Sequence, residues 1–361
     1  MIFIKIIFSR NLKFNIMKKE RILVLDGLRG LAILLVFLFH GYYVWDIFYP
    51  YKKLFSENIL FKYGSLGVQL FFLISGFVIL MSVEKTSGFF KFIKNRWLRL
   101  FPSMLICSVF IYLTAGFFHE RPFGIPELKS LLPGVLFINN GILEKIFGTN
   151  FPVLELSFWS LYVEVKFYII FGALFFAFNR RVALIGIFLL YLSALVLQIL
   201  CFHELLFENT WIKMYVGTFI HFGWFVVGAL TYIYYYNRDR KYLFMILFVW
   251  MCSLLYGYKF QDLMLLIYLI VLNLIFFGAL FWKILNLFFS NRFFQFIGFI
   301  SYPLYLLHEN MLISLIIKIH NQYPEIPPLL LPVFSFVFIG FLAYIIAKYL
   351  EPFLIKLVMK L

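Results

Sequence analysis

The chain has 361 residues, of which 64% are hydrophobic and 14% are charged, and its mean hydropathy is +0.95. A soluble domain of this size would expose large apolar patches with such a composition, so the sequence predicts a polytopic membrane protein. The net charge of +15 does not indicate nucleic-acid binding, because the basic residues lie between apolar runs, as cytoplasmic loop anchors do. The cysteines lie within apolar stretches, without the spacing of a disulfide or metal site: Cys107, Cys201 and Cys252.

The first residues of the chain do not have the pattern of a signal peptide. They contain short apolar runs broken by basic residues, and no small-residue cleavage site follows. Met17 opens the segment MKKERILVLDGLRG, a more usual start for a cytoplasmic N-terminus. We interpret residues 1–20 as an extension, either a misassigned start or an amphipathic stretch at the membrane surface.

Ten apolar runs are long enough to cross a membrane. In chain order they are residues 24–44, 66–83, 101–118, 153–178, 182–201, 212–236, 242–257, 263–282, 296–317 and 329–350. With the N-terminus inside, about two thirds of the 32 Lys and Arg lie on the inner side, so the positive-inside rule places both termini in the cytoplasm. The sequence therefore predicts an all-α integral membrane protein of about ten transmembrane helices, without a soluble domain.

The domain organisation follows from these runs. Residues 21–352 form one transmembrane domain, and residues 353–361 form a short cytoplasmic tail. The longest outside segment, residues 119–152, contains moderately apolar pieces, which indicate a re-entrant or interfacial helix over the bundle.

The first span, LDGLRGLAILLVFLFH, carries three ionisable residues. Asp26 and Arg29 are three positions apart and are neighbours on a helix face, where they can pair. Arg29 and His40 share one face about 16 Å apart along the helix axis. Such a polar stripe indicates a bundle interior or a water-filled cavity. The alternatives are an arginine that anchors the helix at the interface and a histidine that only packs.

A pair of arginines precedes the third span in the segment FIKNRWLRLFPS. Arg96 and Arg99 form a two-pronged cation on a helical turn, and guanidinium groups bind phosphate through paired hydrogen bonds. The alternative is a cytoplasmic anchor of the positive-inside type. Pro102 allows a helix start or a kink beside the pair.

The fourth span, LSFWSLYVEVKFYII, places a carboxylate among hydroxyls. Ser157, Ser160, Glu164 and Tyr168 follow helical spacing and share one stripe. A buried carboxylate needs partners or a raised pKa, so Glu164 is a functional candidate, with structural hydrogen bonding as the alternative. Lys166 lies two residues away on another face, and the sequence assigns it no role.

A second intramembrane histidine occurs in FISYPLYLLHENML. Ser301, Tyr305 and His308 lie on one side of this span, and Glu309 is adjacent in sequence. Pro303 is expected to interrupt the helix and free a carbonyl that can line a cavity. We expect the polar stripes of the different spans to meet.

With these residues identified, the sequence resembles the acyltransferase-3 family of membrane O-acyltransferases, from about Arg21 to Pro352. The matching stretches, in the family's order, are LDGLRGLAILLVFLFH, GSLGVQLFFLISGF, RWLRLFP, FWSLYVEVKFY and GFISYPLYLLH. The family's Arg-x10-His, Arg-x-x-Arg and Ser-Leu-x-x-Glu elements match Arg29 and His40, Arg96 and Arg99, and Ser160, Leu161 and Glu164. The chain departs from the family at Val165-Lys166, where Glu-Gln is usual, and at Glu309-Asn310, where an aromatic-rich dipeptide is usual. A fused extracytoplasmic esterase-like domain is not expected.

The resemblance implies transfer of a short acyl group, usually acetyl, from cytosolic acyl-CoA to a hydroxyl of a glycan or lipid-linked sugar. It implies a multi-pass protein of the bacterial cytoplasmic membrane that uses acyl-CoA as a co-substrate and holds no bound cofactor or metal. His40 would act as a general base, and an acyl-histidine intermediate is the less favoured alternative. The predicted site comprises catalytic His40, Arg29, Glu164 and Asp26, acyl-CoA-binding Arg96 and Arg99, and cavity-lining Ser160, Ser301, Tyr305 and His308.

A different class of protein would share several of these features. A transporter or flippase of a lipid-linked sugar or small anion would also have about ten helices and intramembrane charges. It would not depend on acyl-CoA, and it should tolerate the loss of His40 if Arg29 and Glu164 remain.

Overall fold

The computed structural model describes residues 22–207, 209–255 and 262–360, and all regular secondary structure in these ranges is helical. Nine stretches of the described residues are long and apolar enough to cross a membrane, which agrees with the predicted all-α membrane fold. The predicted span 242–257 corresponds to α12 (Arg240–Leu254), and its expected end lies outside the described residues. The proposed extension, residues 1–20, lies outside them as well.

Two compact units make up the chain. The first consists of the described residues up to Leu28, of Gln69–Ile93 and of Lys166–Asn291. The second consists of Arg29–Val68, Lys94–Val165 and the described residues from Arg292 onward. Because the boundaries fall within helices, α2, α4, α5 and α8 each contribute residues to both units.

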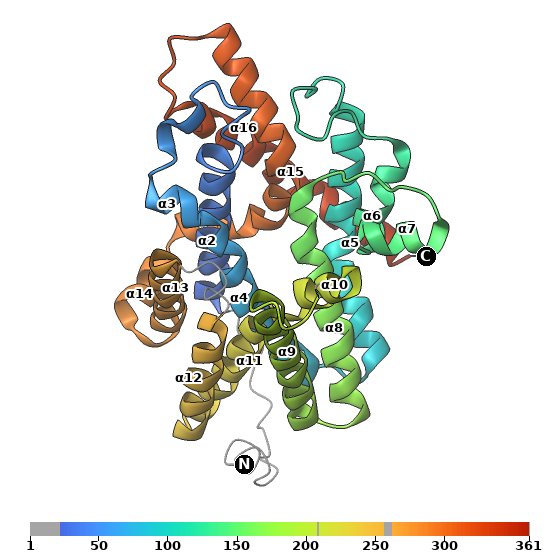
Figure 1. Ribbon diagram of the computed structural model, residues 1–361, viewed down its shortest axis with the longest axis vertical. Coiled ribbons are helices and arrows are strands. Elements are labelled where there is room, and N and C mark those ends of the chain that lie inside the picture. The colour runs from blue at the N-terminus through green and yellow to red at the C-terminus, as the bar shows by residue number, and fades with distance from the viewer. Residues whose placement is uncertain (1–21, 208, 256–261, 361) are drawn as a thin grey trace. The chain divides into compact units, whose positions relative to one another are not determined.

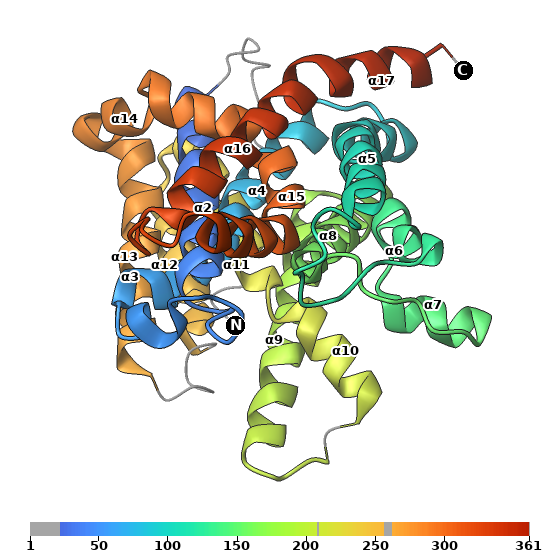
Figure 2. The ribbon, with the colours of Figure 1, turned by 90° about the horizontal axis from the view of Figure 1, so that it is seen from above.

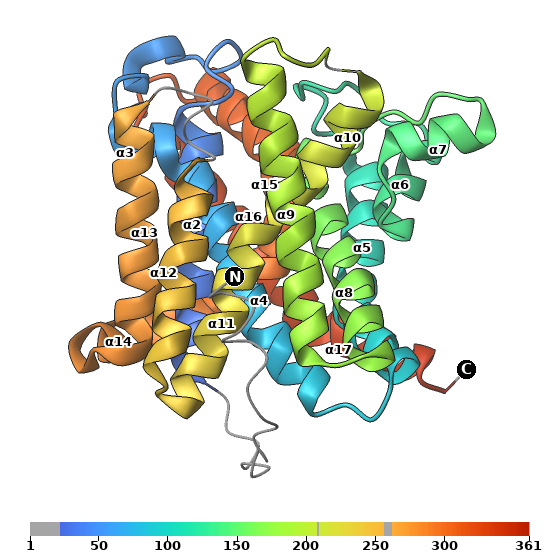
Figure 3. The ribbon, with the colours of Figure 1, turned by 60° about the horizontal axis from the view of Figure 1, so that its bottom comes forward.

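The first unit is a bundle in which helices that follow one another in the chain pack together. α9 contacts α10 and α11, and α11 contacts α12 (Figures 2 and 3). Asn or Asp caps the first turn of four of these helices through its side-chain oxygen, which explains where they begin: Asn179, Asn209, Asp239 and Asp262. The helices of this unit are α4 (Gly67–Glu84), α8 (Trp159–Ala177), α9 (Arg180–Phe202), α10 (Thr210–Phe219), α11 (Phe222–Asn237), α12, α13 (Leu263–Phe281) and α14 (Lys283–Phe289).

Aromatic side chains and two glycines form the core of the first unit. The Phe225 ring stacks on Phe167 at 4.2 Å and on Phe72 at 4.7 Å between ring centroids. A Cβ atom on Gly76 would collide with the carbonyl of Phe225, and one on Gly228 would collide with the backbone of α4. The two glycines therefore allow α4 and α11 to approach closely, as small residues do between membrane helices.

The second unit contains the N-terminal and C-terminal spans. α15 and α16 pack against each other (Figure 1). The segment 119–152, predicted to lie outside, contains two short helices, in agreement with the expectation of helical structure there. The helices of this unit are α2 (Leu23–Tyr42), α3 (Ile59–Lys62), α5 (Phe89–Thr114), α6 (Leu131–Leu136), α7 (Asn140–Phe147), α15 (Arg292–Gln322), α16 (Leu331–Ile345) and α17 (Glu351–Val358).

Three expectations about helix boundaries are wrong. Pro303 does not interrupt α15, because the buried apolar surface on both sides of the proline outweighs one lost hydrogen bond. α5 begins at Phe89, before Arg96 and Arg99. Its first turns contain basic residues, so they do not form an apolar run and the helix start was not predicted. The expected span 212–236 is two helices, with a turn at Ile220 and His221 that contains neither Gly nor Pro and so carries no breaking signal.

Candidate active site

Two histidines from different helices meet inside the second unit. His40 lies near the end of α2 and His308 lies within α15, where it is completely buried. The Nε2 atom of His308 is 3.2 Å from the Nδ1 atom of His40. The two rings are nearly perpendicular, with an interplanar angle of 88°. The expectation that the polar stripes of the first and ninth spans meet is therefore confirmed within this unit.

Backbone carbonyls determine which nitrogen of each ring carries hydrogen. The Nδ1 atom of His40 is 2.9 Å from the carbonyl oxygen of Val36, and the Nδ1 atom of His308 is 2.7 Å from that of Tyr305. Because a carbonyl oxygen only accepts hydrogen bonds, we assign the hydrogen to Nδ1 in both neutral rings. The Nδ1–H of His40 then also points at the unprotonated Nε2 of His308. This assignment leaves Nε2 of His40 with a lone pair that can accept a proton.

Glu309 lies beside that lone pair. Its Oε1 atom is 3.9 Å from Nε2 of His40, and its side chain is 1% exposed. The Oε2 atom accepts a hydrogen bond of 2.8 Å from the backbone N–H of Ser157. The carboxylate is therefore held at one oxygen and directed at His40 by the other.

A second buried carboxylate fixes the next residue of α15. Glu155 accepts hydrogen bonds at Oε2 from the side-chain Nδ2 of Asn310 at 2.6 Å and from its backbone N–H at 3.1 Å. Arg121 lies on the other side, with its Nη2 atom 3.6 Å from Oε1 of Glu155 and 2.7 Å from the carbonyl oxygen of Leu154. These contacts clamp the turn of α15 that carries Glu309 against the segment before α8.

The charges of this clamp are strongly coupled to one another. Burial raises the pKa of the Glu155 carboxyl, Arg121 opposes this shift, and the nearby Glu309 adds to it. Burial lowers the pKa of Arg121, while both carboxylates favour its charged form. Two carboxylates that face a single guanidinium favour a further positive charge close by. Nε2 of His40 lies 3.9 Å from Oε1 of Glu309, one of these two carboxylates.

Two of the predicted cavity-lining hydroxyls also meet. The hydroxyls of Ser160 and Tyr305 are 2.8 Å apart, and Tyr305 donates to the carbonyl oxygen of Ser157 at 2.8 Å. Ser301 instead donates to the carbonyl oxygen of Gly298 in its own helix, at 2.7 Å. The buried hydroxyl of Ser157 has no hydrogen-bond partner within the described part of the chain. Ser157 therefore presents an unused polar atom two residues from the clamp.

The predicted arginines differ in how exposed their side chains are. Arg29 and Arg96 are half-buried and Arg99 is exposed. Glu351 interacts electrostatically with Arg99 and accepts a hydrogen bond of 2.6 Å from Ser103. Arg99 thus has a carboxylate neighbour at the start of α17.

The remaining predicted catalytic residues are Glu164 and Asp26. Glu164 is half-buried and interacts electrostatically with Tyr305. Asp26 is buried in the first unit, and its pairing with Arg29 stays a prediction. Within the described ranges, no group of three or more His, Cys, Asp or Glu side chains is arranged to hold a metal ion.

Sequence reasoning assigned no role to five residues of the site: Arg121, Glu155, Glu309, Asn310 and Glu351. Arg121 lies near the start of the segment interpreted as an outside loop, and Glu155 lies at the start of the predicted span 153–178. Charged residues are common at such positions and carry little information. Asn310 carried a usable signal, because three consecutive polar residues, His308 to Asn310, occur inside a long apolar span. In a membrane helix such a run indicates polar partners on more than one face.

The fold and the buried polar cluster define a multi-pass helical membrane protein with a histidine–carboxylate centre. The chain belongs to the acyltransferase-3 family, whose model, described as an acyltransferase domain, matches residues 22–349. This match covers the stretches that carry the resemblance in the sequence.

Two relatives are similar to parts of the chain. A peptidoglycan O-acetyltransferase, OatA, of Listeria monocytogenes is 28% identical over 177 residues, which are 44% of this chain and 25% of the relative. An O-acetyl transferase of Shigella phage Sf6 is 25% identical over 172 residues, which are 46% of this chain and 50% of the relative. The alignments thus span half or less of these relatives. No solved structure matches the chain significantly.

Proposed function

We propose that this protein is a membrane O-acyltransferase that moves a short acyl group, acetyl in the simplest case, from acyl-CoA to a hydroxyl of a glycan or lipid-linked sugar. The observation that carries the proposal is the orientation of His40, whose Nε2 lone pair is left open by the contacts of Nδ1. Family membership and two O-acetyl-transferring relatives support the reaction class.

In this mechanism His40 is the general base. Its Nε2 atom takes the proton of the acceptor hydroxyl as the oxygen attacks the thioester carbonyl. A carbon–oxygen bond forms, the carbon–sulfur bond breaks, and the imidazolium returns its proton to the departing coenzyme A thiolate. His308 holds the reactive tautomer by accepting from Nδ1–H. Direct transfer needs no acyl-histidine intermediate, although the same nitrogen could form one.

Glu309 would stabilise the imidazolium that forms during the reaction. Its Oε1 atom is close enough, at 3.9 Å, for a strong interaction in a poorly solvated interior. The clamp of Arg121, Glu155 and Asn310 holds this carboxylate in place before the charge develops, which is the condition for electrostatic preorganisation. Glu309 therefore acts through His40 rather than on the substrate.

The donor would bind through Arg96 and Arg99, whose spacing on α5 suits a phosphate-bearing ligand. Arg29 would extend the positive path along α2 toward His40, about 16 Å further along the helix. We assign Glu164 and Asp26 to supporting roles along this path. The topology predicted from the positive charges puts Arg96 and Arg99 at the cytoplasmic face, where they would meet acyl-CoA from the cytoplasm; the membrane would be the cytoplasmic membrane of a bacterium, as the family resemblance implies.

The acceptor would be held by hydroxyl-bearing side chains. The buried, unpartnered hydroxyl of Ser157 lies on the residue whose N–H binds Glu309, so it can bind a sugar hydroxyl near the base. Ser160, Ser301, Tyr305 and His308 would complete the polar lining of this part of the second unit.

The test is acyl transfer by the purified full-length protein in proteoliposomes. Radiolabelled acetyl-CoA would be supplied with a glycan fraction from the cell envelope, and labelled ester would be measured. We expect transfer that depends on His40. Transport of a lipid-linked sugar without acetyl-CoA consumption, retained in His40→Ala, would contradict the proposal and favour a transporter.

A further inference from the structure

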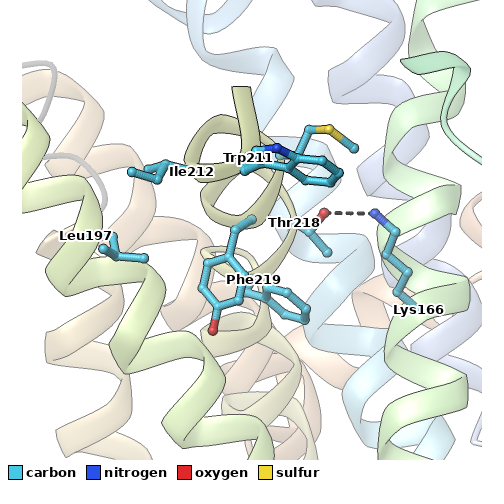
Figure 4. A pocket seen from close by; sticks show the side chains of 8 residues that line it. Lys166, Leu197, Trp211, Ile212, Thr218 and Phe219 are labelled. Atoms are coloured by element: carbon cyan, nitrogen blue, oxygen red, sulfur yellow. Dashed lines mark hydrogen bonds between the residues drawn. The ribbon is translucent and has the colours of Figure 1, made fainter. Parts of the chain in front are cut away.

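An apolar groove opens on the first unit between α8, α9 and α10. Its volume is about 450 Å³, within the size range of ligand sites. Apolar and aromatic side chains such as Leu197, Trp211, Ile212 and Phe219 line it (Figure 4). The same groove contains one cationic side chain, Lys166 of α8.

The environment of Lys166 does not balance its charge. Its ammonium group donates a hydrogen bond of 2.9 Å to the hydroxyl of Thr218 on α10, as Figure 4 shows. Across the described residues, no carboxylate lies within ion-pairing distance of it. A lysine within a membrane span is costly unless it pairs with an anion or reaches water, and such residues commonly mark ligand sites.

The two ends of the groove differ in their expected position relative to the membrane surface. Trp211 lies in the first turn of α10, where tryptophans of membrane proteins settle at the interface with water. Thr218 lies about 10 Å further along the helix, one residue before α10 ends. The groove therefore leads from the expected interface to a cation inside the apolar layer.

We infer that this groove binds an anionic phospholipid of the surrounding bilayer, with an acyl chain along the aromatic wall and the headgroup phosphate paired with Lys166. A long, flexible ammonium can rise toward the interface to meet the phosphate while its stem stays in apolar surroundings. Hydrocarbon complements the lining of the groove, and a negative headgroup complements its one cation. This lipid site is separate from the proposed acyl-transfer chemistry.

The competing account is that Lys166 only ties α8 to α10. Its ammonium group would donate a hydrogen bond to Thr218 and interact favourably with the negative, C-terminal end of the helix dipole of α10. In that account the charge would not select a lipid, and loss of the Thr218 hydroxyl would have the same consequence as loss of the lysine. The two accounts therefore differ in what Thr218→Val does.

The experiment uses the purified full-length protein in nanodiscs and a phospholipid with a photoactivatable acyl chain. Phosphatidylglycerol is compared with phosphatidylcholine of identical chains, and cross-linked peptides of α10 are quantified. We expect phosphatidylglycerol to label α10 about fivefold more than phosphatidylcholine, as one basic side chain near the bilayer surface allows. Lys166→Met should abolish this preference, whereas Lys166→Arg and Thr218→Val should keep it.

Lys213→Met is the matched control, because Lys213 is an exposed lysine of the same helix that does not line the groove. It should leave the preference unchanged. Equal labelling by both lipids in the wild-type protein, or an unchanged preference in Lys166→Met, would overturn the inference. Loss of the preference in Thr218→Val would favour the structural tie. Elution volume and thermal midpoint report folding, and the wild-type comparison of the two lipids decides the question if Lys166→Met does not fold.

Discussion

The interiors of the two units of this protein differ in the side chains that they bury. The first unit fills its core with stacked rings, such as Phe225 between Phe167 and Phe72. The second unit buries Arg121, Glu155 and Glu309 together with His308. Buried charges are costly in such surroundings, whereas aromatic packing is not, so packing alone does not account for the second interior. The contrast supports our proposal that the second unit carries the chemistry.

Among the tests that compare the two units, replacement of His40 should have the largest effect on activity. His40→Ala removes the proposed base and should lower kcat by about 10²- to 10⁴-fold. The matched control is His221→Ala, which removes a buried histidine of the first unit. Acetyl transfer is measured per folded molecule, with the thermal midpoint as the folding criterion. Retention of more than about a tenth of the activity in His40→Ala would show that another group takes the proton.

Loss of the carboxylate beside His40 should have the next largest effect. Glu309→Gln keeps the shape of the side chain but removes the charge that stabilises the imidazolium, so kcat should fall on the order of a hundredfold. Glu84→Gln is the comparison in the first unit, where Glu84 pairs with Arg180 at 2.7 Å and with Tyr232 at 3.0 Å. That change should lower stability without lowering kcat per folded molecule. Equal losses of kcat in both variants would remove the distinction between the units.

The sequence was sufficient to predict the class of fold and the two histidines. Apolar runs revealed the spans, because length and hydropathy alone decide whether a segment can cross a bilayer. His40 and His308 were identifiable since an intramembrane ionisable residue is unusual wherever it occurs. We expected the polar stripes that carry them to meet, and the structure brings Nε2 of His308 to 3.2 Å from Nδ1 of His40.

The clamp could not be predicted in the same way. Arg121 lies near the start of the predicted outside segment 119–152 and Glu155 lies just beyond its end, more than 30 positions away. Their pairing therefore depends on how that segment folds back. The turn between α10 and α11 was missed because its residues, Ile220 and His221, include neither Gly nor Pro. Contacts of this kind arise from tertiary packing, which local patterns do not record.

Conservative changes at the arginine pair should affect substrate binding more than catalysis. Arg96→Lys or Arg99→Lys keeps the positive charge but loses the planar fork, so we expect a several-fold higher KM for acyl-CoA with kcat nearly unchanged. Lys94→Arg, an exposed position of the same helix, serves as the control. An unchanged KM in both lysine variants would return the pair to the role of a cytoplasmic anchor.

The smallest effect on activity is expected from a packing change in the first unit. Gly228→Ala introduces a methyl group where α11 touches the backbone of α4, and overpacking of this kind costs about 1–3 kcal/mol. The thermal midpoint should therefore fall while kcat per folded molecule stays the same. A large loss of kcat at unchanged stability would show that the packing of the first unit contributes directly to catalysis.

The most direct test of the account is a double-mutant cycle between His40 and Glu309, with residual acetyl transfer measured in proteoliposomes. If Glu309 acts through His40, Glu309→Gln should lower kcat strongly in the wild-type protein and have no further effect in His40→Ala, because groups that act as a unit are non-additive. If the two losses instead multiply in the double variant, the carboxylate and the histidine act independently, and the proposed centre is wrong.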